Sequence, residues 1–282
     1  MQNIAYYNGR TGAPEELTVP FLDRALFFGD GCYDAAFVID GRPVDLEDHV
    51  TRFFNSMRMM KIVPDFTREE LEEILLGLNA QISAPAAMIY WQVSRGTAPR
   101  THFFPPEGTK PNLLATVSAK KLPDGLTPVD FITVEDKRHH FCNVKTLNLF
   151  GNVMANQAAH EAGAYEAIFI RPDGFVTEGS HTNCMILKDG VLYTHEDGEL
   201  ILPGITKKAV LACVRELGIP VAERAFTREE LWAADEIFVT GSSTFTKRGK
   251  TLDGTPVGMK DSETYERIAR AFWKHATGRE LD

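Results

Sequence analysis

The sequence lacks any long hydrophobic run. No stretch approaches the roughly 20 consecutive apolar residues that a membrane-spanning helix needs. The first residues, MQNIAYYNGR, have neither the basic start nor the apolar stretch of a secretory signal. Only four cysteines occur, and no two of them form a C-x-x-C pair, which is typical of reduced thiols in the cytosol. These absences predict a soluble, cytoplasmic protein.

Positive charge is also scarce. The chain has 30 Lys and Arg residues against 39 Asp and Glu residues, a formal net charge of −9. Surfaces that bind nucleic acids need clusters of Lys and Arg to contact phosphates, so we expect no nucleic-acid partner. The 44% hydrophobic and 24% charged fractions are typical of a globular protein, and 282 residues suffice for about two domains.

Several familiar catalytic motifs are absent or incomplete. Gly29-Asp30-Gly31 begins like a dinucleotide-binding loop, but Asp34 occupies the position of the third glycine. The sequence contains no P-loop. His139, His140 and Cys142 are clustered, but the second half of a metal-ligand set is missing, so we expect no metal site.

Helix and strand signals occur in groups rather than in strict alternation, which favours an α+β fold. We expect helices after Asp45, at Thr67 with its Thr-x-x-Glu capping box, after Lys145, after Thr206, at TREELWAA and at the carboxyl end. Strands are expected at AMIYWQVS, NLLATVSA, DFITVE, EAIFIR, NCMILK and VLYTH. Asp189-Gly190 is typical of a hairpin turn between the last two strands.

The best candidate for a linker is AKKLPDGLTP, which contains two prolines and one glycine. The sequence therefore predicts two α+β domains. The smaller would span residues 1–119, the linker 120–123, and the larger 124–282, which would carry Lys145.

Lys145 lies in NVKTLNLFGN, among amide and apolar neighbours and without an acidic residue within several positions. An amine in such surroundings can form an imine with a carbonyl compound and later transfer a proton. The alternative is a structural or merely solvated lysine. Glu178 in VTEGSHTN lies in a strand-like segment that Gly179 breaks, and small hydroxyl and amide groups surround it. The alternative is an ordinary acid in a turn.

A helix start follows the Pro203-Gly204 turn in ILPGITKKAVLACVREL. Backbone N–H groups at a helix start, together with the hydroxyl of Thr206, can bind a phosphate. Thr206 as a plain N-cap residue is the alternative. The turn TGSST after the strand EIFV could contact the same anion.

Taken in order, FGDG-x-Y, D-H-x-x-R, RGTAPRTH, VKTLNLFGN, EGSHTN, LPGIT and FVTGSS resemble the fold-type IV aminotransferases that use pyridoxal 5'-phosphate. The resemblance runs from about Tyr7 to Ser243, and through RGTAPRTHFFP it is greatest to the D-amino acid transaminases of that family. It implies the two-domain fold of the family. The implied reaction is transamination between a D-amino acid such as D-alanine and a 2-oxo acid such as 2-oxoglutarate, by a ping-pong mechanism through pyridoxamine phosphate.

The resemblance also implies roles for single residues. Lys145 would hold the cofactor as a Schiff base and then act as the acid and base of the proton shift. Glu178 would face the pyridine nitrogen and keep the ring protonated, which makes it a better electron sink. The remaining contacts implied for the cofactor are Leu202 under the ring, and Arg52, the N–H groups of Ile205 and Thr206, and the turn at Ser242 at the phosphate.

Tyr33, Arg100 and His102 resemble the family's binding site for the substrate carboxylate. An extended backbone, favoured by Pro99, would place Arg100 and His102 on one face. In the family these two side chains reach in from the neighbouring subunit, which implies a homodimer. The alternative for Arg100 is an ordinary surface charge.

Three departures from the family pattern leave the substrate open. Asp34 stands where relatives usually have glutamate, His181 where serine is common, and residues 244–250 lack the usual Pro-Val. Branched-chain L-amino acid transamination, amine transamination or an aminodeoxychorismate-type lyase reaction on the same scaffold are the alternative functions. A protein that binds pyridoxal phosphate or another phosphate without turnover is another alternative. We interpret His181 as a polar group that fills space, and the alternative is a second acid or base near the bound cofactor.

Overall fold

The computed structural model describes residues 3–124 and 126–281, and the chain divides into two compact units. Unit 1 comprises Met1–Leu122 and Val144–Asn148, and unit 2 comprises Pro123–Asn143 and Leu149–Asp282. The short segment that carries Lys145 is therefore grouped with unit 1, whereas the predicted second domain included it. Its chain neighbours on both sides belong to unit 2.

Unit 1 contains a six-stranded sheet in the order β2-β1-β6-β5-β3-β4, in which every neighbouring pair is antiparallel. Two of the predicted strands, AMIYWQVS and NLLATVSA, are confirmed as β5 and β6. The strands are β1 (Asn3–Tyr7), β2 (Arg10–Gly12), β3 (Gly31–Ile39), β4 (Arg42–Pro43), β5 (Ala86–Ser94) and β6 (Asn112–Ala119).

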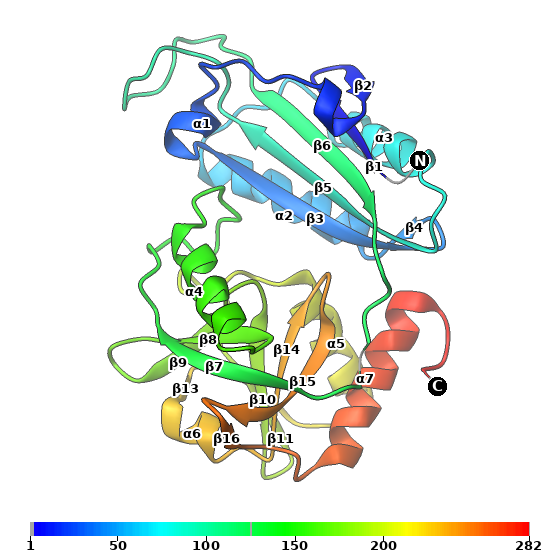
Figure 1. Cartoon of the computed structure of the whole chain (residues 1–282), viewed down its shortest axis with the longest axis vertical. Helices are drawn as coiled ribbons and strands as arrows, with labels where there is room; N and C mark the ends of the chain where they lie inside the picture. Colours follow the sequence, from blue (N-terminus) through cyan, green and yellow to red (C-terminus); the bar gives the residue numbers. More distant parts are fainter. Residues whose placement is uncertain (1–2, 125, 282) are drawn as a thin grey trace. The chain divides into compact units, whose positions relative to one another are not determined.

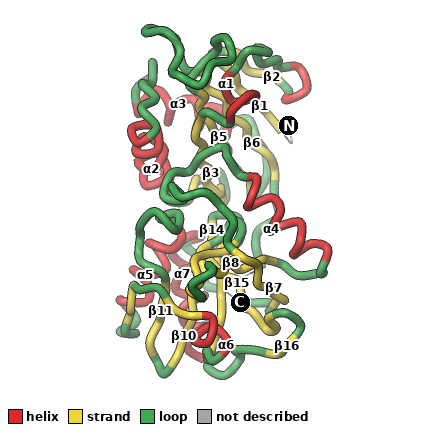
Figure 2. The backbone as a smooth tube through the Cα atoms, turned by 90° about the vertical axis from the view of Figure 1, so that its left-hand side faces the viewer, coloured by secondary structure: helices red, strands yellow, loops and turns green. Residues whose placement is uncertain are grey.

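Helices α2 (Leu46–Met59) and α3 (Arg68–Asn79) cover one face of this sheet (Figures 1 and 2). The helical spacing predicted after Asp45 is confirmed, because Val50, Phe53 and Met57 are buried in one cluster with Trp91 of β5. The capping box at Thr67 is also confirmed. The other helical segments of unit 1 are the 3-10 turn Pro14–Glu16 and α1 (Arg24–Phe28).

Unit 2 contains a ten-stranded mixed sheet in the order β12-β11-β10-β14-β15-β7-β8-β9-β13, with β16 paired to β15. The predicted hairpin at Asp189-Gly190 is confirmed, since both residues have positive φ angles and β10 pairs with β11 in antiparallel register. The strands are β7 (Val129–Glu135), β8 (Glu166–Ile170), β9 (Phe175–Gly179), β10 (Asn183–Lys188), β11 (Val191–Thr194), β12 (Val221–Glu223), β13 (Phe226–Thr227), β14 (Glu236–Gly241), β15 (Phe245–Leu252) and β16 (Thr255–Pro256).

The helices of unit 2 pack on different strands of this sheet. Helix α4 (Phe150–Glu161) contacts β7 and β8, whereas α5 (Ile205–Glu216) and α7 (Ser262–Thr277) contact each other and, respectively, β14 and β15 (Figure 1). Helix α6 (Arg228–Trp232) is short. Within the described ranges, none of the helices has the length and apolar character that crossing a membrane requires.

Candidate active site

Lys145 is held against the start of β3 in unit 1. Its carbonyl accepts a hydrogen bond from the Tyr33 N–H (2.9 Å), and its own N–H donates to Ser56 Oγ (3.3 Å). The Leu147 N–H donates to the Gly31 carbonyl (3.0 Å). The Nζ atom lies 4.4 Å from the centroid of the Tyr33 ring. The structure thus brings together two predicted site residues, Lys145 and Tyr33, and it fixes the backbone of the lysine at both its N–H and its carbonyl.

Arg52 lies on α2, one helical turn before Ser56, and is paired with a buried acid. Its Nε and Nη2 atoms donate to the two carboxylate oxygens of Asp34 at 2.9 and 2.8 Å, and His49 Nδ1 lies 2.7 Å from the same carboxylate. Asp34 is fully buried. The two parallel bonds to the Asp34 carboxylate orient the guanidinium.

Asp34 is therefore the residue that fixes the orientation of Arg52. Burial raises the pKa of Asp34, but the charges of Arg52 and His49 and their hydrogen bonds outweigh this effect and hold the pKa well below its usual value. His49 and Arg52 both come from the D-H-x-x-R motif. Residues three apart on a helix share a face, so both side chains reach Asp34. No local pattern in the sequence indicated this role of Asp34.

Replacing Asp34 with asparagine should destabilise the protein by about 3–5 kcal/mol at pH 7, because the buried charge of Arg52 loses its partner. A carboxyl group with a depressed pKa stabilises the fold above the ordinary pKa of about 4, and this contribution is lost as the pH falls towards the depressed value. Urea unfolding between pH 7 and pH 3 should therefore give a shallower loss of stability in Asp34→Asn than in the wild type.

The matched control for this prediction is Asp65→Asn. Asp65 forms an exposed ion pair with Lys110 in the same unit, and exposed pairs contribute only about 0–1 kcal/mol. Equal unfolding free energies for Asp34→Asn and the wild type at pH 7 would contradict the prediction.

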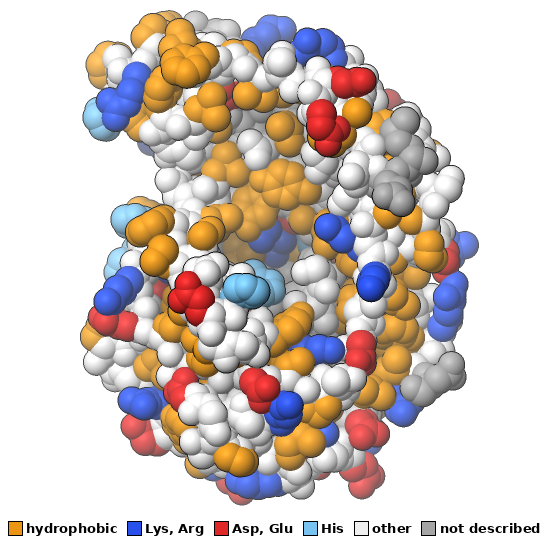
Figure 3. Space-filling model, viewed as in Figure 1, with side chains coloured by type: hydrophobic (Ala, Val, Ile, Leu, Met, Phe, Trp, Pro, Cys, Tyr) orange, Lys and Arg blue, Asp and Glu red, His pale blue; other side chains and the backbone are white. Residues whose placement is uncertain are grey.

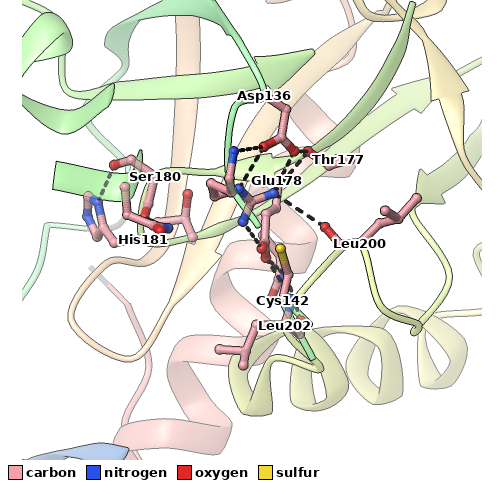
Figure 4. A network of polar contacts seen from close by, with 12 residues as sticks. Asp136, Cys142, Thr177, Glu178, Ser180, His181, Leu200 and Leu202 are labelled. Atoms are coloured by element: carbon pink, nitrogen blue, oxygen red, sulfur yellow. Dashed lines mark hydrogen bonds and ion pairs between the residues drawn. The ribbon is translucent and has the colours of Figure 1, made fainter. Parts of the chain in front are cut away.

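In unit 2, Glu178 near the end of β9 is 5% exposed and bonded through both carboxylate oxygens (Figure 4). Arg138 Nη1 donates to Oε1 at 2.5 Å. Asn183 Nδ2 and the Leu202 N–H donate to Oε2 at 3.0 and 3.1 Å. These contacts favour the ionised carboxylate. They also place Leu202, a second predicted site residue, directly beside Glu178.

Arg138 is a residue that the sequence analysis missed. Besides Glu178, it donates through Nε and Nη2 to the two oxygens of Asp136 at 3.0 and 2.8 Å, and its Cζ lies 4.2 Å from the centroid of the Phe169 ring. Burial lowers the pKa of Arg138, but Asp136 and Glu178 outweigh it and raise the pKa above its ordinary value. In the sequence Arg138 lies in EDKRHH, which is typical of an exposed charged run.

The turn after Glu178 is organised by a second buried acid, Glu166. One of its oxygens accepts from the Ser180 N–H (3.0 Å) and the Ser180 hydroxyl (2.5 Å). The other oxygen accepts from the Thr182 hydroxyl (2.8 Å) and lies 3.0 Å from His181 Nδ1. A Cβ atom at Gly179 would lie 2.2 Å from Thr182 Oγ1, so this turn requires glycine. His181 is therefore hydrogen-bonded to the turn.

The first turn of α5 presents backbone N–H groups. Its N-cap residue is Gly204, which has no side chain to cap them. Thr206 lies within the first helical turn, so its interpretation as the N-cap is wrong. A Cβ atom at Gly204 would lie 1.9 Å from Asn183 Oδ1, which explains why glycine stands here. Ile205 and Thr206 are thus at the positive end of the helix dipole, where anions bind favourably.

Ser242 lies in the turn between β14 and β15, two residues after Thr240. Thr240 pairs across β10 and β14 with Asn183, the same residue that Gly204 approaches. In residues 3–124 and 126–281, Thr240 Oγ1 is buried without a hydrogen-bond partner. An unsatisfied buried hydroxyl costs about 1–3 kcal/mol, which a hydrogen-bonding ligand within reach would offset.

Arg100 and His102 lie on the loop between β5 and β6 of unit 1. The backbone bends at both residues, so the expected extended conformation is wrong. The two side chains nevertheless reach the same ring. Arg100 Cζ lies 5.0 Å and the His102 ring centroid 5.4 Å from the centroid of Phe28.

The chain matches one family model and many known proteins. Residues 31–246 match the model of the class IV aminotransferases. The D-alanine aminotransferase of Bacillus licheniformis is 37% identical over 254 residues, which cover 89% of this chain and 89% of that protein. The chain belongs to the class IV aminotransferase family, whose members depend on pyridoxal phosphate, and the predicted family is confirmed.

Solved structures show the same fold. The branched-chain amino acid aminotransferase of Escherichia coli superposes with a TM-score of 0.88 at 24% identity, covering 100% of this chain and 97% of that one. The branched-chain aminotransferase of the thermophilic archaeon Thermoproteus uzoniensis, solved with norvaline, gives a TM-score of 0.87 at 25% identity, covering 96% and 93%. The predicted α+β, fold-type IV architecture is confirmed.

Proposed function

We propose that this protein is a pyridoxal-phosphate-dependent transaminase that transfers the amino group of a D-amino acid, such as D-alanine, to a 2-oxo acid, such as 2-oxoglutarate. The observation that carries the proposal is the 37% identity to D-alanine aminotransferase over 89% of both chains. The likeness to branched-chain enzymes, at 24% and 25% identity, supports only the fold. The segment RGTAPRTHFFP, with Arg100 and His102, supports the same substrate class.

The residues present fit pyridoxal phosphate. Glu178, kept ionised by Arg138 and Asn183, suits a protonated pyridine nitrogen. The uncapped start of α5 with Ile205 and Thr206 suits a phosphate, as does the Ser242 turn next to the buried Thr240 hydroxyl. Arg52 adds a positive charge, and the side chain of Leu202 suits one face of the ring. When bound, the cofactor supplies an electron sink for the substrate carbon.

In the proposed reaction, different side chains of the protein attach the cofactor, transfer the proton and bind the substrate. Lys145 provides an amine that attaches the cofactor and carries a proton to and from the substrate. Its backbone bonds to Tyr33 and Ser56 limit the directions that Nζ can reach. Arg100 and His102, with Tyr33, bind the substrate carboxylate, since a guanidinium matches a carboxylate with two parallel hydrogen bonds.

A homodimer in the cytoplasm is part of the proposal, with Arg100 and His102 serving the neighbouring subunit. Large hydrophobic side chains are exposed around the same loop, among them Phe103 (74%), Phe21 (79%) and Leu26 (59%). Figure 3 shows hydrophobic side chains gathered with basic and histidine side chains at this end of unit 1. Exposed apolar patches of this kind support a subunit contact. All four cysteines are free, in keeping with a reducing compartment.

Visible absorption spectra of the purified protein test the proposal, with D-alanine and L-alanine added separately. We expect the band of the lysine-bound cofactor to disappear with D-alanine and to return after 2-oxoglutarate is added. Loss of the band with L-alanine alone would contradict the D preference and favour an L-amino acid transaminase. A band that no amino acid changes would indicate cofactor binding without turnover.

A further inference from the structure

The loop that carries Arg100 and His102 is anchored at its base to the start of α1 and the residues just before it. The Arg24 N–H donates to the Gly96 carbonyl (3.0 Å), and the Ala98 N–H donates to the Leu22 carbonyl (3.1 Å). Gly96 has a φ of +105°, and a Cβ atom there would lie 2.1 Å from the Lys110 carbonyl oxygen. The two ends of the loop therefore approach each other closely, and its base is fixed by backbone contacts.

A cluster of three charged side chains, of which the two arginines are buried, connects this base to the tip of the loop. Asp30 accepts hydrogen bonds from Arg24 Nε (2.7 Å) and from Arg95 Nε (2.9 Å). Arg24 Nη1 then donates to the Thr101 carbonyl (2.9 Å), between Arg100 and His102 in the chain. Arg24 is 3% and Arg95 is 9% exposed. A hydrogen bond from a buried, paired guanidinium holds Thr101 more firmly than a bond in water would.

Arg95 holds the same loop through a second set of contacts, with the residues after α2 and with the ring of Phe104. Its Nη1 and Nη2 atoms donate to the carbonyls of Lys61 (3.0 Å) and Met60 (2.8 Å), which follow α2. Its Cζ lies 3.8 Å from the centroid of the Phe104 ring, so Phe104 stacks on the guanidinium. Thr101 and Phe104, the residues flanking His102 and Phe103, are thus held by two arginines that share Asp30.

The side chains of Arg24, Arg100 and His102 all lie near the ring of Phe28. Arg24 Cζ lies 4.9 Å and Arg100 Cζ 5.0 Å from its centroid, and the His102 ring lies at 5.4 Å. Among the contacts within the described chain, Phe28 is the one aromatic ring that Arg100 and His102 share. Both side chains are otherwise exposed, so this ring limits the orientations that they can adopt.

We propose that Phe28, together with the Arg24–Asp30–Arg95 cluster, positions Arg100 and His102 for binding the substrate carboxylate, which makes Phe28 and Arg24 positioning residues for substrate recognition. The inference rests on the proposed function of Arg100 and His102. It assigns a role to the phenylalanine and the aspartate of the FGDG motif. Both substrates of the proposed reaction carry a carboxylate, so a displaced Arg100 weakens the binding of the D-amino acid and of the 2-oxo acid alike.

Phe28→Leu is the principal test, with Phe28→Tyr as the conservative variant and Phe66→Leu as the matched control. Phe66 is a partly buried ring of the same unit that packs on Phe54, 6.1 Å away. We expect Phe28→Leu to raise KM for both substrates about tenfold or more while kcat changes less than about threefold. Phe28→Tyr and Phe66→Leu should keep the wild-type values.

Hydrogen exchange provides a readout that does not depend on activity. Peptides covering residues 97–105 should exchange faster in Phe28→Leu than in the wild type, and unchanged exchange there would overturn the inference. Arg24→Lys retains the positive charge beside Asp30 but loses the guanidinium, which bonds Asp30 and the Thr101 carbonyl at the same time. It should likewise raise KM and speed exchange in these peptides, which tests the inference even if Phe28→Leu folds poorly.

Arg100→Ala separates failure of the inference from failure of the proposed function. If Arg100→Ala raises both KM values and Phe28→Leu raises neither, the inference is overturned while the proposed function stands. A Phe28→Leu variant with lower thermal stability and unchanged KM would show a purely structural ring, with the same conclusion. If Arg100→Ala leaves KM unchanged, the carboxylate role of Arg100 fails, and the inference fails with it.

Discussion

Replacing Lys145 with alanine should reduce kcat for D-alanine and 2-oxoglutarate by at least about 10⁴-fold. Proton transfer by a positioned side chain contributes about 10²–10⁴-fold, and the same variant also removes the amine that attaches the cofactor. The fold should persist, because Lys145 is held through backbone atoms: its carbonyl accepts from the Tyr33 N–H and its N–H donates to Ser56. Pyruvate formation from D-alanine, followed with a coupled lactate dehydrogenase assay, measures the loss.

Borohydride reduction of the loaded protein locates the attachment independently of activity. In the wild type, we expect the mass of the cofactor to remain on the peptide that contains Lys145 after digestion. The exposed Lys110 provides the matched control, since its side chain is 82% exposed, and Lys110→Ala should retain full activity. A cofactor mass on a different lysine, or full activity in Lys145→Ala, would refute the assignment.

Replacing Glu178 with glutamine should lower kcat by about 10²–10³-fold, the effect typical of removing one preorganised electrostatic contact at developing charge. Glutamine is neutral and of similar size, so it cannot favour the protonated pyridine ring as a carboxylate does. The visible band should remain, because Lys145 is intact. Single-turnover spectra with D-alanine would measure the chemical step directly.

The control for this substitution must separate lost chemistry from lost structure. In Glu178→Gln, Arg138 still pairs with Asp136 through Nε and Nη2, so we expect only a modest loss of stability. Glu223→Gln removes an exposed ion pair with Arg215 in the same unit and should have no effect on kcat. A Glu178→Gln enzyme within about threefold of wild-type kcat would contradict the role of the carboxylate.

Local signals in the sequence predicted many of the elements. The capping box at Thr67, the Asp189-Gly190 turn and the apolar face of α7 with Tyr265 and Phe272 all depend on residues within a few positions of one another. Such contacts leave a periodic or short-range pattern in the sequence. The expected extended geometry at Arg100 failed because long-range contacts shape that loop, such as the hydrogen bond from Arg24 to Thr101 across 77 positions.

By itself, the sequence determined the family, since the ordered motifs around Lys145, Glu178 and the α5 start are continuous stretches of chain. Only the tertiary structure decided which charges meet. Arg138 reaches Glu178 across 40 positions, and Arg52 reaches Asp34 across 18 positions. Ion pairs between distant residues depend on how strands and helices are packed, and each partner alone looks like an ordinary surface charge. The same packing, rather than any local pattern, groups Lys145 with unit 1.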